Sequence, residues 1–372
     1  MCDYNKNKKR FGSAIEHGKA HESDHRSWSR RSFLKNVGMV GSASLVLGNL
    51  PLTAFGASPL AMALNEGPSD RILILIRLNG GNDGLNTIIP LYDYDNYRNL
   101  RPTIGIAESD YTKLSDEFAI PNTLLDLNPL WQEGKMKVVN TVGYPNQNLS
   151  HFRSSDIWAS ASDANVNDTS GWLGRYLSNI YPDFLENPPE IPPAIQIGGV
   201  GNLAFNDLES NSMAVKLDDP DQLFEIAQNG QLYDTQNLPD CHFGEQLGYI
   251  RNVTNNTFKY AEIIKQAYDN GSNAVEYEGN LGQQLGLIAR LIKGNLGTKF
   301  YMVTLDGFDT HANQSFYHPL LMLQLSGAIS QFYQDLGTSS HDKEVLCMTI
   351  SEFGRRIEQN ASGGTDQVAA SP

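Results

Sequence analysis

Acidic and imidazole side chains gather in one short stretch of the chain, residues 306–314. It reads Asp-Gly-Phe-Asp-Thr-His-Ala-Asn-Gln, with Asp309 and His311 two positions apart. In an extended segment, side chains two positions apart point the same way. A carboxylate and an imidazole side by side suit a divalent metal ion. A capping Asp and a hydrogen-bonded loop His also explain this spacing, because two-ligand matches are common by chance.

Three other polar side chains stand close after apolar runs. Asp83 lies in a turn with three glycines, where the backbone can approach a ligand closely, although Asp also forms turns by itself. His151 ends a polar loop, where a lone His is commonly structural. Arg355 follows the last apolar run and can bind an anion through two parallel hydrogen bonds. A solvent-facing salt bridge is the simpler explanation for one of Arg355 and Arg356.

Short apolar runs before these residues predict the strands of a mostly parallel sheet. The runs are Ile72–Ile76, Met136–Val142, Ala194–Ile197, Lys299–Leu305 and Val345–Ile350. The run Ile72–Ile76 is continuously apolar, as a strand covered on both faces would be. In such α/β sheets, ligands bind beyond the carboxyl ends of the strands. The candidate residues are therefore expected to meet at one edge of the sheet.

Helical patterns separate these strands. They cover residues 171–177, 221–228, 244–269, 282–293 and 319–336. The spacing of apolar residues in 282–293 is that of a helix face packed on a core. The interval 206–280 is acidic and rich in amides, which predicts a helical insertion over the sheet. Residues 64–372 are accordingly expected to form a single α/β domain.

The net charge argues against one class of partner, and two states are compatible with the cysteines. The chain has 28 Lys and Arg against 42 Asp and Glu, a formal net charge of −14. Nucleic acid is not expected as a partner, because a phosphate-binding surface needs a basic footprint. Cys241 and Cys347 can pair in an oxidising compartment, but Cys347 lies in an apolar run, which favours a buried thiol.

A paired-arginine motif near the amino end predicts export. Residues 29–35 read SRRSFLK, a weakly apolar run follows at 37–52, and Ala61–Ala63 offers a small-x-small cleavage pattern. Residues 1–63 are therefore expected to be a twin-arginine signal that is removed. The translocase is then a partner, and the mature protein is periplasmic or secreted. The alternative is a basic arm with a short anchor, but the apolar run is too short and Gly-rich to span a membrane comfortably.

Five stretches together resemble a bacterial family catalogued as domain of unknown function 1501. They are RLNGGNDGLNTIIP (Arg77–Pro90), YPNQNLSHF (Tyr144–Phe152), GWLGRYL (Gly171–Leu177), GFDTHANQ (Gly307–Gln314) and SEFGRRIEQNASGGTD (Ser351–Asp366). They occur in family order across nearly all of the expected mature chain. That family is similar to a branch of the alkaline phosphatase and sulfatase superfamily.

The resemblance implies an alkaline phosphatase-like three-layer sandwich, with helices on both faces of a mostly parallel sheet. One or two divalent ions (Zn, Mn, Mg or Ca) are expected at the carboxyl ends of the strands. The implied metal ligands are Asp83, Asp309, His311 and Asp366. The implied activity is hydrolysis of a phosphate or sulfate ester, with an anionic ester or a polysaccharide as substrate.

Further residues are expected to take part in this chemistry. They are Thr87 or Ser150 as the nucleophile, His151 facing the site, and Arg355 binding the anionic substrate. The metal ions would polarise the ester and lower the pKa of the attacking group.

The chain departs from the family pattern at its carboxyl end. Where the family reads G-T-D-H-G, residues 364–368 read Gly-Thr-Asp-Gln-Val. Gln367 offers an amide oxygen in place of an imidazole nitrogen, and borderline metals bind that oxygen poorly. Family members usually continue further, so the domain is expected to be incomplete, with an uncovered sheet edge. A non-catalytic exported binding protein and a truncated, inactive copy are therefore the alternatives.

Overall fold

The computed structural model describes residues 45–47, 50–52, 71–199, 201–235, 237–239 and 242–368. The SRRSFLK motif, the expected cleavage site at Ala63 and Cys241 lie outside these residues. Near the amino end, β1 (Leu45–Leu47) pairs antiparallel with β2 (Leu50–Leu52). Across the described residues, no helix combines the length and apolar character needed to cross a membrane.

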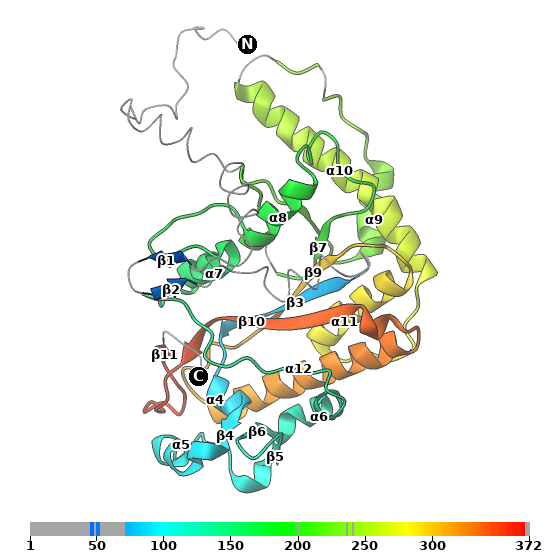
Figure 1. Ribbon diagram of the computed structural model, residues 1–372. Helices are drawn as coiled ribbons and strands as arrows, with labels where there is room; N and C mark the ends of the chain where they lie inside the picture. Colours follow the sequence, from blue (N-terminus) through cyan, green and yellow to red (C-terminus); the bar gives the residue numbers. More distant parts are fainter. Residues whose placement is uncertain are drawn as a thin grey trace, which may run out of the picture. The chain divides into compact units, whose positions relative to one another are not determined.

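A six-stranded sheet organises the described chain from residue 71 onward (Figure 1). Its strands, in order across the sheet, are β11 (Gln367–Val368), β10 (Val345–Arg355), β3 (Ile72–Gly81), β9 (Phe300–Asp306), β7 (Ala194–Gln196) and β8 (Ala214–Lys216). Five of them are parallel, and β11 pairs antiparallel with the end of β10. The expectation of an α/β fold with a mostly parallel central sheet is confirmed.

Helices connect these strands. They are α4 (Gly84–Thr87), α5 (Tyr94–Leu100), α6 (Asn128–Gln132), α7 (His151–Ser160), α8 (Trp172–Ile180), α9 (Pro220–Asn229), α10 (His242–Asn270), α11 (Gly279–Lys293) and α12 (Gln314–Gly337). A second, antiparallel sheet has the order β4 (Ile89–Pro90), β6 (Phe118–Pro121) and β5 (Tyr111–Lys113). It packs near α5. Arg101, which follows α5, reaches Asp83 at the end of β3.

Strand β3 lies inside the central sheet, between β10 and β9. Its side chains alternate between the two faces, because successive residues of a strand point to opposite sides. Ile74 and Ile76 pack in a core with residues of α11 and α12. Leu73 and Leu75 pack in another core with residues of α7 and α8. Both faces are covered, which is why the run 72–76 is apolar without interruption.

Four of the five expected strands form, as β3, β7, β9 and β10. The fifth prediction is wrong, because residues 136–142 form neither helix nor strand. Val139 in this run is 77 % exposed and Val142 is 44 % exposed. An apolar run becomes a strand only where it finds a partner, and in the described structure this run pairs with none.

The interval 206–280 contains two of its expected helices, α9 and α10. It also contributes β8, which pairs parallel with β7 and was not expected. The interval is therefore not only a helical insertion, since it completes one side of the central sheet. A three-residue strand carries too little apolar pattern to be recognised without its partner.

Helix α12 begins at Gln314, five residues before the expected start at Pro319. The loop before β11 allows this extension. The N–H of Asn313 donates to the carbonyl of Ser362 at 3.2 Å, and that of Gln314 to Gly363 at 2.9 Å. The first N–H groups of a helix have no partner inside it, so these bonds hold its start. The loop and the helix thereby fix each other beside the end of β9.

Candidate functional site

A tight turn after β9 carries Asp309 and His311 to the carboxyl edge of the sheet. Gly307 leaves the strand with a φ of +106°. Gly80, at the end of β3, has a φ of +122° and faces this turn. A Cβ on Gly80 would lie 2.7 Å from the backbone of Phe308 and Asp309. Glycine is required there because any side chain would push the turn away from β3.

Two imidazole rings flank the carboxylate of Asp309. The Nε2 atom of His311 lies 3.0 Å from Asp309 Oδ1, and the Nε2 atom of His151 lies 3.4 Å from Asp309 Oδ2. His151 is the first residue of α7, so it reaches the cluster from a different part of the chain. The three side chains are 37 to 46 % exposed, so a solute can reach them.

Each ring has a second carboxylate behind it. Glu352 Oε2 lies 2.7 Å from His151 Nδ1, and Asp366 Oδ1 lies 3.4 Å from His311 Nδ1. The 2.7 Å contact with Glu352 assigns the ring proton of His151 to Nδ1. His311 has a carboxylate near each ring nitrogen, 3.0 Å from Nε2 and 3.4 Å from Nδ1. We assign its proton to Nδ1 because the amide nitrogen of Gln367 faces Nε2 at 3.1 Å. The Nε2 atom of each ring then keeps its lone pair. This is how histidines that bind metals are commonly oriented.

The two Nε2 atoms converge on the side-chain amide of Gln367. Gln367 Nε2 lies 2.9 Å from His151 Nε2, 3.1 Å from His311 Nε2 and 3.4 Å from Asp309 Oδ1. An amide N–H is a donor, which agrees with the assignment of both Nε2 atoms as acceptors. Gln367 thus marks one point that three potential ligands face. We call His151, Asp309 and His311 the edge cluster.

Arg355 supports the edge cluster from behind, and its expected role in binding a substrate anion stays a prediction. Its side chain is fully buried. Its guanidinium donates to the carbonyls of Gly81, Thr365 and Phe308 at 2.7, 2.8 and 2.8 Å, and to Asp309 Oδ1 at 2.8 Å. Burial by itself would raise the pKa of Asp309, but the hydrogen bond and charge of Arg355 hold it below its usual value.

Asp366 lies next to the edge cluster without facing its centre. It approaches the Nδ1 side of His311, while the other potential ligands face Nε2. Asn360 donates to Asp366 Oδ1 at 3.0 Å. This hydrogen bond is the largest influence on the carboxyl group and lowers its pKa. Asp366 is therefore placed to orient His311, and its expected role as a direct metal ligand stays a prediction.

Asp83 belongs to a different, buried group. Its side chain is 1 % exposed, and Arg101 Nη1 lies 2.6 Å from Asp83 Oδ2. Gln314 also donates to this oxygen, while Oδ1 has no hydrogen-bond partner among the described residues. Burial would raise the pKa of Asp83, but the charge and hydrogen bond of Arg101 keep it below the usual value. Within the described chain, Asp83 contacts no member of the edge cluster.

The two candidate nucleophiles differ in their surroundings. Thr87 is half-buried, and its hydroxyl donates to the carbonyl of Asp83 at 2.8 Å. It also lies within 3.2 Å of the side chain of Asn82. Ser150 is exposed, precedes His151 directly, and makes no capping hydrogen bond to α7. Only Ser150 is therefore both accessible and next to the edge cluster in the chain.

Glu352 is a site residue that was not predicted from the sequence. It is 4 % exposed, and its Oε1 accepts hydrogen bonds from Arg77 and Ser155 at 2.7 Å each, while Oε2 orients His151. The available signal was its position after an apolar run, which is the signal that selected Asp309. Its partner His151 is 201 residues away, and that pairing is visible only in the folded chain.

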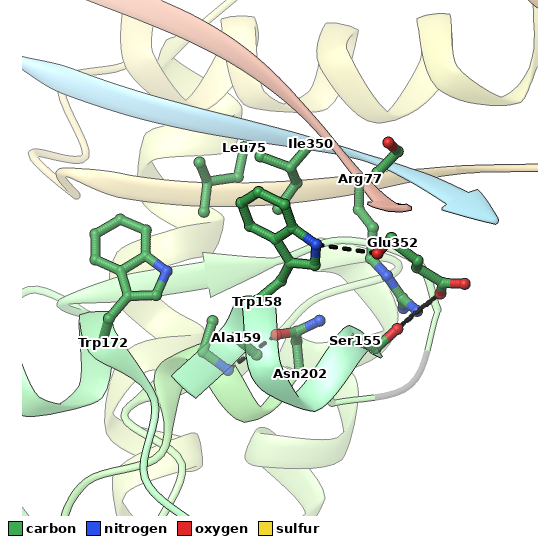
Figure 2. Close-up of a pocket in the computed structure, with 11 residues that line it drawn as sticks. Leu75, Arg77, Ser155, Trp158, Ala159, Trp172, Asn202, Ile350 and Glu352 are labelled. Atoms are coloured by element: carbon green, nitrogen blue, oxygen red, sulfur yellow. Dashed lines mark hydrogen bonds and ion pairs between the residues drawn. The ribbon is translucent and has the colours of Figure 1, made fainter. Parts of the chain in front are cut away.

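A small pocket lies beside Glu352 (Figure 2). Its volume of about 30 Å³ has room for little more than a small chemical group. Figure 2 shows two indole rings along the sheet and the charged groups at one end. The lining includes Trp158, Trp172, Leu75, Ile350, Arg77 and Glu352. The pocket is mostly apolar and adjoins the carboxylate that orients His151.

The edge cluster fits a divalent ion in donor type but not in its present spacing. No group of three or more His, Cys, Asp or Glu side chains in the described part of the chain is arranged to hold a metal ion. The Nε2 atoms lie 2.9 and 3.1 Å from the Gln367 amide, whereas metal–nitrogen bonds are about 2.0–2.1 Å. Each ring would have to move by about 1 Å toward an ion at this point. Rotation of exposed side chains can supply such a movement.

A comparison with known families identifies one match. The family model described as "Protein of unknown function (DUF1501)" matches residues 135–370, more than half of the chain. No curated protein and no solved structure gives a significant match. The matched interval contains the whole edge cluster, together with Glu352, Asp366 and Gln367, whereas Asp83 and Thr87 precede it.

Proposed function

The chain belongs to the family described as Protein of unknown function (DUF1501), and we propose that it is an exported, metal-dependent hydrolase of phosphate or sulfate esters. One observation carries this proposal. The Nε2 atoms of His151 and His311 and the carboxylate of Asp309 face one point at the carboxyl edge of a parallel sheet. Nitrogen and carboxylate donors of this kind suit Zn, Mn and related ions.

The residues around the edge cluster have defined tasks in this proposal. His151, His311 and Asp309 would hold the ion, which when bound would polarise an ester oxygen and activate a nucleophile. Glu352 and Asp366 hold the Nδ1–H groups, so that both rings present Nε2. Of the two candidate hydroxyls, the exposed Ser150 is the better nucleophile, because Thr87 is already hydrogen-bonded.

Export and the wider fold are further parts of the same proposal. The SRRSFLK motif supports twin-arginine export to the periplasm or beyond. A parallel sheet with helices on both faces, and polar residues at its carboxyl edge, supports an alkaline phosphatase-like sandwich. The proposed substrate class rests on this likeness and on the partial exposure of the edge cluster to solvent.

A non-catalytic exported binding protein is the second candidate. It is favoured by the position of Gln367, whose amide stands where an ion would bind. A scaffold of this kind does not by itself imply activity. The two candidates differ in whether loading with metal produces turnover.

The test is metal binding and hydrolysis by the purified full-length chain. Calorimetric titration with Zn²⁺ and Mn²⁺ should show one ion per chain, and the loaded protein should hydrolyse 4-nitrophenyl phosphate or 4-nitrophenyl sulfate. The His311→Ala variant should bind at least about 100-fold more weakly, since losing a ligand costs at least as much as losing its hydrogen-bond partner. His341→Ala, outside the cluster, is the matched control. Absence of binding, or equal binding by both variants, would contradict the proposal.

A further inference from the structure

Gln367 is held at the edge cluster by its backbone. It lies in β11 and pairs with Arg355 of β10. Next to it, the N–H of Arg356 donates to the carbonyl of Asp366 at 2.9 Å. Arg355 also donates to the carbonyl of Thr365. These bonds fix the backbone of residues 365–367 along the end of β10. The sheet itself therefore directs the side chain of Gln367 toward the cluster.

The amide of Gln367 satisfies the hydrogen bonding of the cluster. A carboxamide carries two N–H donors, and three acceptors face its nitrogen: His151 Nε2 at 2.9 Å, His311 Nε2 at 3.1 Å and, more distantly, Asp309 Oδ1 at 3.4 Å. The two shorter contacts, both to ring nitrogens, use both donors. The opposite nitrogen of each ring bonds a carboxylate. Every polar atom of the two rings therefore has a partner when no ion is bound. An incoming cation must break both amide bonds before it can be bound by both rings.

We propose that Gln367 determines whether the edge cluster takes a metal ion, by competing for the two lone pairs that would bind it. The inference rests on the proposed function, because it concerns the same site. An ion enters when the Gln367 side chain rotates away from the two rings. This movement needs rotation about side-chain bonds alone, while the pairing of β11 with β10 remains.

The size of the effect follows from the two hydrogen bonds that are lost. Each of these hydrogen bonds stabilises the metal-free cluster by a modest free energy. Two such bonds in competition lower the apparent metal affinity by about tenfold or more. Removing the donors should therefore strengthen metal binding, although it deletes a polar group from a polar site. A purely structural role for Gln367 predicts no such gain.

The experiment compares two variants with the full-length chain. Gln367→Ala removes the side chain, and Gln367→Met keeps similar length without N–H donors. Zn²⁺ and Mn²⁺ affinities are measured by calorimetry, and thermal unfolding shows whether each variant folds. Both variants should bind about tenfold more tightly or better, and Gln324→Ala, at an exposed position of α12, should bind like the original chain.

The outcomes separate this inference from the proposed function. If the original chain binds metal through His311 but neither folded variant binds more tightly, the competition is overturned and the proposed metal site stands. Weaker binding by both variants would show that Gln367 is a ligand, which also overturns it. If neither the original chain nor the variants bind, both proposals fail together.

Discussion

Two acidic side chains follow neighbouring strands of one sheet and lie in different surroundings. Asp83 follows β3, and Asp309 follows β9. Asp83 is 1 % exposed and paired with Arg101, whereas the side chain of Asp309 is 46 % exposed and faced by two imidazoles. We call the first group, Asp83 with Arg101 and Gln314, the buried cluster.

The difference shows what makes a carboxylate at a sheet edge structural or functional. Both carboxylates contact an arginine and have a lowered pKa. Arg101 and Gln314 both donate to Asp83 Oδ2, and burial keeps solutes from the other oxygen. Arg355 instead takes one oxygen of Asp309 and leaves the other toward His151. Accessible lone pairs, more than charge, therefore distinguish the candidate site.

The largest effect is expected at Arg101. The Arg101→Met variant should lower the free energy of unfolding by about 3–5 kcal/mol, because it leaves the Asp83 charge buried without its partner. Asp309→Asn should lower it by about 1 kcal/mol or less, because Asp309 is partly exposed and an amide oxygen can still accept from Arg355. Urea unfolding followed by circular dichroism measures both. Equal losses at the two positions would remove the contrast between the clusters.

A buried histidine near Asp83, His318, should also make stability depend on pH. Its Nε2 atom lies 3.2 Å from Asn82 Oδ1, and the charges of Asp83 and Arg101 act on the ring. Burial lowers the pKa of His318 to about 4, below the ordinary value of about 6.5. As the pH falls, His318 is therefore protonated in the unfolded chain at a higher pH than in the folded chain. Stability is therefore complete above pH 6.5 and falls as the pH drops from 6.5 toward 4, by about 3 kcal/mol in total.

Unfolding at several pH values checks this expectation. The His318→Gln variant cannot take up a proton and should lose most of the decline between pH 6.5 and 4. His341→Gln, at the half-buried His341, serves as the control and should keep it. A decline that is unchanged in the His318 variant would show that another group is responsible.

A smaller effect is expected at Glu352, which supports the edge cluster. Glu352→Gln keeps the shape of the side chain but removes the carboxylate that orients His151. Loss of such a partner lowers metal affinity by about 10–100-fold. Calorimetric titration with Zn²⁺ measures the change, and Glu358→Gln is a control outside the cluster. If Glu352→Gln binds metal as tightly as the original chain, the assignment of the His151 proton is wrong.

Sequence reasoning succeeded where the signal is local. The apolar runs at 72–76 and 299–305 predicted interior strands because burial on both faces removes polar residues from the pattern. The positions of Asp309 and His311 directly after such a run placed them at the edge of the sheet, where the structure brings them together. Residues 136–142 include Lys137 and Asn140 and form no strand, because pairing depends on a partner elsewhere in the chain.

The rest of the site depends on contacts between distant residues. Asp83 and Asp309 both follow an apolar run in the sequence. Only the folded chain shows that Asp83 is buried against Arg101, a contact that no spacing rule reveals. Glu352 and His151 meet across 201 positions. Gln367 was recognised as a departure from a family pattern, but its location between the two rings required the folded chain.

The most direct measurement is a crystal structure of the protein soaked with Zn²⁺, with the ion located by its anomalous scattering. We predict an ion about 2.0–2.2 Å from His151 Nε2, His311 Nε2 and an Asp309 oxygen, with the Gln367 amide nitrogen turned away. An ion bound by Asp83 instead, or a fully ordered edge cluster that stays without an ion at saturating Zn²⁺, would contradict the account.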